Sequence, residues 1–460
     1  MKNPLLIPEL RELMAVNDTA AIREFCQQSH PESVAELIEA LDTEEIWRIL
    51  QMLDLPQRAS IFSHFDLDQQ VELATGHNRV QMAHLLEEMP ADDRADLVQN
   101  LDKKVRDELL PLVARAERED IKRLARYEEE TAGAAMSTDY AVLRPDVTIE
   151  EAIHQLRAQA PDKETIYYIY VVDEYRKLIG FVSLKDIIVA RPGRLIRDLM
   201  HTDVIKANVH DDQESVANQV EKYDLIAIPV VDDDNVIVGI VTHDDAIDII
   251  RQEQTEDIEK LMAISGEHES TPYLKISAWR HFRNRATWIF ILGLVSLIGG
   301  LIIQLHEEML VQIAVLATLI PMLAATGGNT GSQSAALVIR ALAVKEIFGR
   351  DILRVLFKEF CVALPLAFVM SILAFGRLFL FASGETMPPG VSLWMLAFAA
   401  GVALALQVLS STLIGALLPL GAVALKLDPA VVASPSLATI VDITGLLIYF
   451  TVVSVMVMPA

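Results

Sequence analysis

A single carboxylate inside an apolar stretch is the first residue of chemical interest. Asp442 lies in the otherwise uncharged run 429–460, within SPSLATIVDITGLLIYF (434–450). A charge near the centre of a bilayer costs at least ~2.5–3.5 kcal/mol on insertion scales, so an intramembrane carboxylate usually belongs to a substrate or ion path. Two structural alternatives are a carboxylate that ties two helices together and one that is protonated in a packed bundle.

The neighbours of Asp442 support a polar path. On a helix, Pro435, Ala438, Asp442, Gly445 and Tyr449 share one face, and the opposite face is Leu, Ile and Val. We expect this polar strip of the helix to face other protein segments or water rather than lipid. A proline here also leaves carbonyl oxygens of the preceding turn free to face a cavity.

A second segment supplies neutral oxygens. PMLAATGGNTGSQSAALVIR (321–340) contains Gly328 and Asn329 among other small or polar residues. It predicts a tight helix crossing, or an unwound turn whose carbonyls line a cavity, and plain small-residue packing is the alternative. Together with Asp442 it forms a hard-ligand set, without a Cys, His or Met cluster for softer metals.

Charge divides the chain of 460 residues into two parts. Residues 1–276 hold 56 of the 64 acidic and 29 of the 39 basic side chains, a net charge of about −27, whereas the remainder carries about +2. Such an acidic part repels nucleic acid and attracts cations. The two cysteines offer no disulfide framework, which suits a reducing cytoplasm. No nucleophile and base constellation is apparent, so we expect no enzyme.

Residues 1–130 predict an acidic, solenoid-like module of short helices. Runs such as PESVAELIEALD and MPADDRADLVQNL place Leu, Val and Ile at helical spacing between acidic or proline-containing turns. Asp92 and Asp96 share one helical face, which suits cation binding. Helix caps and a solvated surface are the alternatives.

Residues 131–252 contain an internal repeat at a shift of 59. Val171, Val172, Asp173, Gly180, Ser183 and Asp186 match Val230, Val231, Asp232, Gly239, Thr242 and Asp245. The two units resemble a pair of CBS domains, which form a disc with clefts for adenine nucleotides. Ser183-x-x-Asp186 and its counterpart resemble the ribose-contacting element, because a carboxylate accepts two hydrogen bonds from a diol. The same Ser/Thr-x-x-Asp motif is also typical of a capped helix start.

The remainder predicts a charged linking helix in 253–275, running to Tyr273, and a membrane domain in 276–460. We expect five spans, in 286–305, 309–339, 360–381, 387–425 and 429–460. Basic residues precede the first span and lie between the second and third, so the acidic part is expected in the cytosol and the C-terminus outside. The expected fold class is multi-domain, with an α, an α/β and an all-α membrane part.

These motifs together resemble the MgtE family of magnesium channels and transporters. The resemblance covers nearly the whole chain and rests on TGGNTGSQSAALVIRALA, SPSLATIVDITGLLIY, YEEETAGAAM (127–136) and ETIYYIYVVDE (164–174). It implies a homodimer in the inner, or plasma, membrane whose fifth spans face each other across a pore. The Asp442 pair would hold a hydrated Mg²⁺ near the backbone of Ala438, with Gly328 and Asn329 close by.

The resemblance also implies that cytosolic Mg²⁺ closes the pore by bridging carboxylates. The matching residues are Asp92, Asp96, Asp212, Glu214, Asp224, Asp245, Asp248, Glu253, Glu256, Asp257 and Asp428. For ATP, the matching residues are Tyr168, Lys185 and Asp186, with Ser183 and Thr242 in the ribose elements. Lys185 stands where the family can have Arg, and lysine is a poorer planar donor.

Three functions remain open from the sequence. The first is a Mg²⁺ channel gated by its cytosolic part, because clustered carboxylates spread without a cation and approach when one binds. The second is an ion-coupled transporter or exporter of divalent cations, which a single intramembrane carboxylate would also serve. The third is a membrane-anchored nucleotide sensor, which leaves Asp442 and the glycine-rich segment unexplained.

Overall fold

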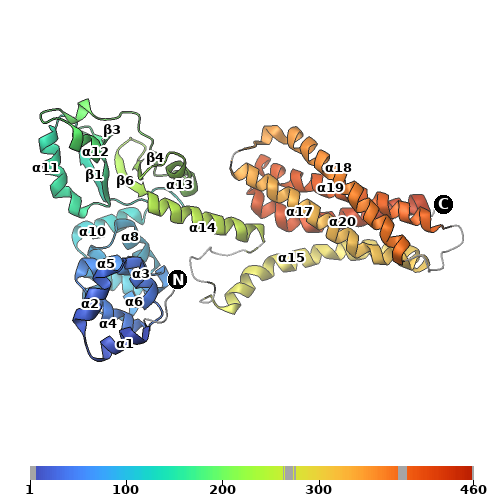
Figure 1. The fold of residues 1–460 in the computed structure, drawn as a ribbon, viewed down its shortest axis with the longest axis horizontal. Helices are drawn as coiled ribbons and strands as arrows, with labels where there is room; N and C mark the ends of the chain where they lie inside the picture. Colours follow the sequence, from blue (N-terminus) through green and yellow to red (C-terminus); the bar gives the residue numbers. More distant parts are fainter. Residues whose placement is uncertain are drawn as a thin grey trace. The chain divides into compact units, whose positions relative to one another are not determined.

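The structure is a computed structural model that describes residues 7–262, 264, 273, 276–344, 346–381 and 391–457, without the side chains of 162 and 430–435. The chain divides into two compact units, built mainly from residues 1–253 and 254–460. Each unit is described separately below, and Figure 1 gives the element labels.

The N-terminal segment is a solenoid of short helices, as its sequence predicts. Acidic or amide caps such as Asp42 and Asn78 accept hydrogen bonds from the first backbone amides of their helices, which fixes where each helix begins. Alternate helices stack, with α3, α5, α7 and α9 in one row and α4, α6 and α8 in another. The helices are α1 (Ile7–Ala15), α2 (Thr19–Gln28), α3 (Pro31–Ile38), α4 (Thr43–Gln51), α5 (Leu55–Ser63), α6 (Leu67–Gly76), α7 (Arg79–Glu87), α8 (Ala91–Asn100), α9 (Lys103–Leu109), the 3-10 turn η2 (Leu110–Leu112) and α10 (Arg115–Leu124).

Two matching three-stranded sheets follow. In each sheet the first strand is parallel and the third antiparallel to the central strand. Gly180 pairs with Val171 in one sheet and Gly239 with Val230 in the other, so the register repeats at the shift of 59 residues. The elements are β1 (Tyr140–Leu143), α11 (Ile149–Gln159), η3 (Ala160–Asp162), β2 (Thr165–Val172), β3 (Leu178–Ser183), α12 (Leu184–Val189), η4 (Ile196–Asp198), β4 (Ala207–Asn208), α13 (Gln213–Lys222), β5 (Ala227–Val231), β6 (Ile237–Thr242) and α14 (His243–Leu261).

The solenoid packs directly on the second repeat. Ala91 and Ala95 of α8 share a buried apolar cluster with Ala246 and Ile249 of α14 and with strand residues of β5 and β6. Small side chains at these contacts allow the two helices to approach closely. As a consequence, the acidic residues of α8 lie beside the acidic first turn of α14.

The linking helix is shorter than its sequence predicts. α14 continues from the second repeat past residue 253 as one helix and ends at Leu261, and Tyr273 is not helical. Residues 263, 265–272, 274 and 275 lie outside the described residues.

The second unit is a bundle of long helices. Four helices in the described part of the chain are long and apolar enough to span a membrane, over 278–305, 349–381, 393–424 and 436–457. The elements are α15 (Ala278–Leu305), α16 (Glu307–Gln312), η5 (Ala314–Leu319), α17 (Ile320–Ala343), η6 (Gly349–Asp351), α18 (Ile352–Phe381), α19 (Leu393–Ala424) and α20 (Pro429–Val457).

The expected second span differs from the sequence-based boundaries. The segment 309–339 is not one helix but α16, η5 and the 24-residue α17. α17 has the length of a span, yet its Thr, Gly, Asn, Ser and Gln residues make it too polar to count as one by hydropathy. Its membership of the bundle follows from packing, since α17 contacts both α19 and α20.

The glycine-rich segment forms a tight helix crossing rather than an unwound turn. A Cβ on Gly415 of α19 would collide with the backbone carbonyl oxygen of Gly331 on α17. The hydroxyl oxygens of Thr330, which directly precedes Gly331, and of Ser411, one turn before Gly415, are 2.6 Å apart. Backbone contact of this kind is typical of small-residue helix packing in membranes.

This crossing predicts a contrast between two glycines. Gly415→Ala should destabilise the bundle by about 2 kcal/mol or more, because its new methyl group would meet backbone that has no flexible side chain to move. Gly328→Ala should be neutral or slightly stabilising, because a Cβ there meets nothing within 4 Å. Thermal unfolding of the detergent-solubilised protein compares the two, and equal stability of both variants would contradict the close crossing.

Candidate functional site

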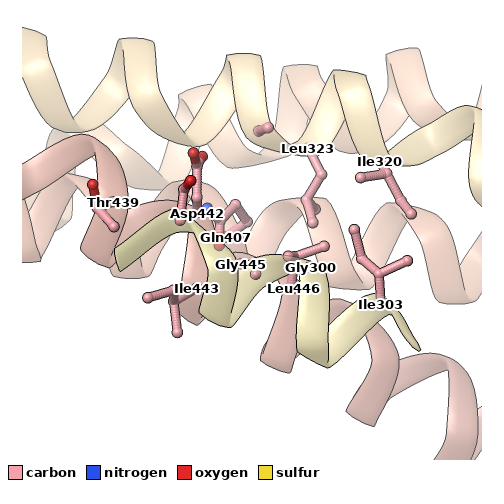
Figure 2. A pocket seen from close by; sticks show the side chains of 13 residues that line it. Gly300, Ile303, Ile320, Leu323, Gln407, Thr439, Asp442, Ile443, Gly445 and Leu446 are labelled. Carbon is pink, nitrogen blue, oxygen red and sulfur yellow. The ribbon is translucent and has the colours of Figure 1, made fainter. Parts of the chain in front are cut away.

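Asp442 lies in the middle of α20 and lines a cavity of about 220 Å³ (Figure 2). The cavity walls come from α15, α17, α19 and α20, and include Gly299, Ala324 and Gln407. Its carboxylate is exposed in the single chain. A charged group in a hollow between apolar helices can therefore meet water or a hydrated cation.

The polar strip of α20 is only partly free. Ala438 and Asp442 are exposed, whereas Gly445 and Tyr449 are buried against the same chain. The Tyr449 hydroxyl donates a 2.9 Å hydrogen bond to the carbonyl oxygen of Leu316, so it anchors α20 to η5. The side chain of Pro435 lies outside the described residues. The exposed part of the strip is thus centred on Asp442.

Gly328 and Asn329 do not line this cavity. Asn329 is exposed, and nothing approaches the Cβ position of Gly328 within 4 Å. Within one chain, the close contacts of α17 are at Gly327 and Gly331 rather than at Gly328. Gly328 and Asn329 lie on a face of α17 that the described chain leaves open.

The first unit contains a cluster of carboxylates between α8 and the second repeat. Burial is the main cause of each pKa shift, and repulsion by Asp245 is the next. The pKa of Asp93 and that of Glu164 are raised to about 7, that of Asp96 to about 6, and that of Asp92 well above its usual range. We call these four residues and Asp245 the acidic interface.

The most enclosed member of the acidic interface is Asp92. The Oδ1 atom of Asp92 is buried and accepts no hydrogen bond from the described residues. Two carboxylates ~4 Å apart repel by about 4 kcal/mol at an effective dielectric of ~20. Within the part of the chain that the structure describes, no three acidic or histidine side chains converge closely enough to hold a metal ion. The cluster is therefore electrostatically strained but not assembled as a coordination sphere.

A second acidic group forms within the other unit. Lys260 makes ion pairs with Glu256 and with Asp428, the latter at 3.3 Å. Burial, and then repulsion by Asp428, raise the pKa of Asp257. Glu256, Asp257 and Asp428, three of the acids named from the sequence, thus lie near one another, with a lysine ammonium among the carboxylates.

The remaining predicted acids do not form one group. Asp212 caps the start of α13, and Glu253 accepts a 2.8 Å hydrogen bond from the neighbouring Gln213. Asp224 follows the other end of this ten-residue helix, ~15 Å away along its axis. Asp248 is exposed and pairs with Arg251 at 3.4 Å. Glu214 lies in the first turn of α13, near Asp212.

The two ribose-like elements have different surroundings. In the first repeat, Ser183 caps α12 and donates a 2.6 Å hydrogen bond to Asp186, and this bond lowers the pKa of Asp186. The ring of Phe181 packs against Tyr168 and stacks on His201, whose Nε2 is 3.7 Å from Asp186. This carboxylate therefore lies beside an aromatic surface. Lys185 is exposed next to it.

In the second repeat, Thr242 donates hydrogen bonds to Asp244 and Asp245, and Asp245 belongs to the acidic interface. Both elements thus have the hydrogen bonds of a capped helix start, which the Ser/Thr-x-x-Asp motif also predicts. Only the first combines its carboxylate with stacked rings, whereas the second faces other acids.

Sequence reasoning missed several residues of these groups. Asp93 and Glu164 join the acidic interface, and both lie in motifs that the sequence singles out. Lys260 is hidden in a charged helix and has no distinguishing pattern. Gln407 could have been noticed, because it is the one amide in the 32-residue apolar helix α19.

The fold and these sites define a multi-pass membrane protein that also carries a pair of CBS-like repeats. Three sequence profiles match the chain: "MgtE intracellular N domain" over 29–130, "CBS domain" over 132–193 and 196–252, and "Divalent cation transporter" over 320–452. They correspond to the solenoid, the two sheets and the helix bundle.

The chain belongs to the MgtE family of magnesium transporters. It is 37% identical to "Magnesium transporter MgtE" of Thermus thermophilus over 97% of each chain. It is 35% identical to the protein of that name from Bacillus subtilis, over 79% of this chain and 78% of the other.

Solved structures resemble the first unit. One is the cytosolic domain of the Mg²⁺ channel MgtE in complex with ATP, with 37% identity and a TM-score of 0.50 over 52% of this chain and 98% of that one. Another is the soluble part of a magnesium transporter, with 35% identity and a TM-score of 0.51 over 54% and 97%.

Proposed function

We propose that this protein carries Mg²⁺ into the cell through a path that contains Asp442, and that cytosolic Mg²⁺ closes the path. The single observation that carries the first part is the carboxylate of Asp442 at a cavity between apolar helices. Family membership supports Mg²⁺ as the ion. A hard cation that keeps several waters needs only one or two carboxylates and neutral oxygens.

The conducting form is a homodimer in the cell membrane. Asp442, Ala438, Gly328 and Asn329 lie on helix faces that one chain leaves open, and a second copy would place two such faces opposite each other. The two Asp442 carboxylates would repel each other unless a cation lay between them. Membrane lipid covers the apolar outer surfaces. The acidic N-terminal part lies in the cytoplasm and the C-terminus outside, in accord with the basic residues beside the first span.

The ion path closes when Mg²⁺ binds to the acidic groups of the cytosolic part. At the acidic interface, burial and then repulsion raise the pKa of Asp92, Asp93 and Glu164, and Mg²⁺ would offset the repulsion. At the end of α14, it would replace or supplement Lys260 between Glu256, Asp257 and Asp428. Asp212, Glu214, Asp224, Asp248 and Glu253 would take part through contacts between domains or between copies. Since Mg²⁺ binds the compact arrangement better, it shifts the population toward that arrangement.

The boundaries of these parts follow the charge and the fold. The cytosolic helical domain is 1–130, the CBS pair 131–252, the linking segment 253–275 and the transmembrane domain 276–460, with α17 as the fifth membrane helix. Activity as an enzyme is not part of this function.

ATP binds at the first repeat. Asp186 would accept hydrogen bonds from the ribose diol, with Tyr168 and the stacked Phe181 and His201 beside the base, and Lys185 near the phosphates. Ser183 orients the carboxylate. Thr242, in the second repeat, faces the acidic interface, where a polyanion is disfavoured by repulsion.

Nucleotide binding can be measured by calorimetry on the full-length protein. Asp186→Asn should weaken ATP binding by about 10-fold or more, because it loses charge-assisted hydrogen bonds to the ribose. Asp245→Asn is the matched control at the equivalent position and should leave ATP affinity within about 2-fold. Equal loss in both variants would contradict a site confined to the first repeat.

Magnesium uptake is tested with purified protein in liposomes that contain a Mg²⁺-sensitive dye. Wild-type protein should fill the liposomes with Mg²⁺, and protein-free liposomes should not. Absence of uptake by folded protein at low internal Mg²⁺ would contradict the proposed function.

A further inference from the structure

Gln407 is a fully buried amide at the cavity that Asp442 lines (Figure 2). It projects from α19 toward α17 and α20, and its Nε2 atom donates a 3.0 Å hydrogen bond to the backbone carbonyl of Val441, the residue before Asp442. The amide therefore contacts the turn of α20 that carries the intramembrane carboxylate.

The neighbouring helices leave a slot for this amide. A Cβ on Gly327 would collide with Nε2 of Gln407, and a Cβ on Gly445 would lie 2.5 Å from it. Glycines on two different helices thus make room for one polar side chain. Filling this space with an amide rather than an apolar group implies that its polar atoms have a use.

Only one end of the amide is satisfied. The Oε1 atom is buried and accepts no hydrogen bond from the described residues. An amide oxygen can accept two hydrogen bonds, and a buried acceptor is nearly always paired with protein or with ordered water. The cavity at this position is large enough to hold several waters. Waters of a hydrated cation beside Asp442 would supply the missing donors.

We propose that Gln407 is a positioning and selectivity residue of the ion path: its Nε2 fixes the Asp442 turn, and its Oε1 accepts a hydrogen bond from a water of the hydrated cation. The cation keeps its inner waters, and the amide oxygen forms its hydrogen bond only when one of these waters lies at the correct distance. A smaller, more tightly hydrated ion is favoured over a larger one that loses water more readily. This role rests on the proposed role of Asp442 in the path.

The test uses Gln407→Met in the full-length protein. Methionine matches glutamine in length and flexibility and removes both polar atoms. The half-saturating Mg²⁺ concentration of liposome uptake should rise about 3-fold or more, and the ratio of Mg²⁺ to Ca²⁺ flux should fall by a similar factor. Thr412→Val is the matched control: Thr412 is buried on the same helix, donates to Val408 of that helix and to no other helix among the described residues, and does not line the cavity.

Size-exclusion profile and thermal unfolding are measured first for both variants. If Gln407→Met does not fold, Gln407→Glu takes its place, because it keeps an oxygen at the Oε1 position and replaces the donor; it should change the ion ratio while Thr412→Val does not. A folded Gln407 variant with wild-type half-saturation and wild-type ion ratio overturns the proposal. Asp442→Asn in the same assay distinguishes failure of the proposed ion path from failure of the proposed role of Gln407. Normal flux through Asp442→Asn refutes the path itself. No flux through Asp442→Asn, together with wild-type behaviour of Gln407→Met, refutes only the role of Gln407.

Discussion

Asp442→Asn should reduce Mg²⁺ flux at least ~100-fold without unfolding the protein. The substitution keeps the shape of the side chain and removes the only carboxylate among the described residues that line the cavity. Since Asp442 is exposed and no hydrogen bond from its side chain holds another described helix, the bundle should stay intact. A neutral amide offsets far less of the charge of a divalent ion than a carboxylate does.

The control for this variant is Glu308→Gln, which neutralises an exposed acid in α16, away from the cavity. It should conduct like the wild type. Flux is followed with a Mg²⁺ dye in liposomes at equal protein content, checked by size-exclusion profile. Conduction by Asp442→Asn within a factor of two of the wild type would refute the assignment of Asp442 to the path.

The second large effect concerns closure. Replacing Asp92, Asp96 and Asp245 together by Asn should leave the channel open at internal Mg²⁺ concentrations that close the wild type. The three residues lie on both sides of the contact between α8 and α14, so their neutralisation removes the carboxylates through which bound Mg²⁺ would stabilise the compact, closed arrangement. Single variants should shift closure less, because the remaining carboxylates still attract Mg²⁺.

This triple variant is examined by patch recording and by limited proteolysis during a Mg²⁺ titration. Mg²⁺ should protect the cytosolic part of the wild type and not that of the variant. The control neutralises three exposed acids elsewhere in the same unit, Asp146, Glu174 and Asp203, and should behave like the wild type. Normal closure and normal protection in the triple variant would show that these acids are only a solvated face.

The acidic interface also predicts a dependence on pH. Burial and mutual repulsion raise the pKa of Asp93 and Glu164 to about 7 in the folded protein, above their unfolded values near 4. The folded state then binds more protons than the unfolded state between these values, so the free energy of unfolding falls as the pH rises from about 4 to 7.

We therefore expect the metal-free protein to have a cytosolic unfolding transition at least ~2–4 °C lower at pH 8 than at pH 5.5, a change of about 1 kcal/mol or more for a unit of this size. Saturating Mg²⁺ should raise the transition more at pH 8, where the carboxylates are ionised. Scanning calorimetry with and without chelator measures both effects. A transition that rises between pH 5.5 and 8 in chelator would contradict the shifted pKa values.

The sequence allowed the parts of the fold to be predicted where one local pattern dominates. The repeat at a shift of 59 predicted two matching units, and Gly180 and Gly239 indeed occupy equivalent places in the two sheets, where a side chain would strike neighbouring atoms. The length and composition of four apolar helices were equally plain. α17 was harder, since the same small and polar residues that permit its close crossing with α19 also hide it from hydropathy.

The candidate sites were predictable only in part. Asp442 was found because a lone carboxylate in an apolar run is unusual. Asp92 was found because it shares a helical face with Asp96 and matches the family, and Asp245 because of the family resemblance. Glu164 joins the acidic interface through tertiary packing that no local spacing indicates. The neutral Gln407 is placed by glycines on two other helices, a relation between distant segments that only the folded bundle shows. Lys260 likewise acquires its partner Asp428 from a segment far along the chain.

The most direct test of Mg²⁺ conduction through this protein is uptake by purified wild-type protein in liposomes with no proton or sodium gradient and only a Mg²⁺ gradient. We predict rapid Mg²⁺ entry that is unchanged when proton and sodium gradients are imposed in either direction. Entry that requires one of these gradients, or that reverses with it, would contradict a channel and identify an ion-coupled transporter instead.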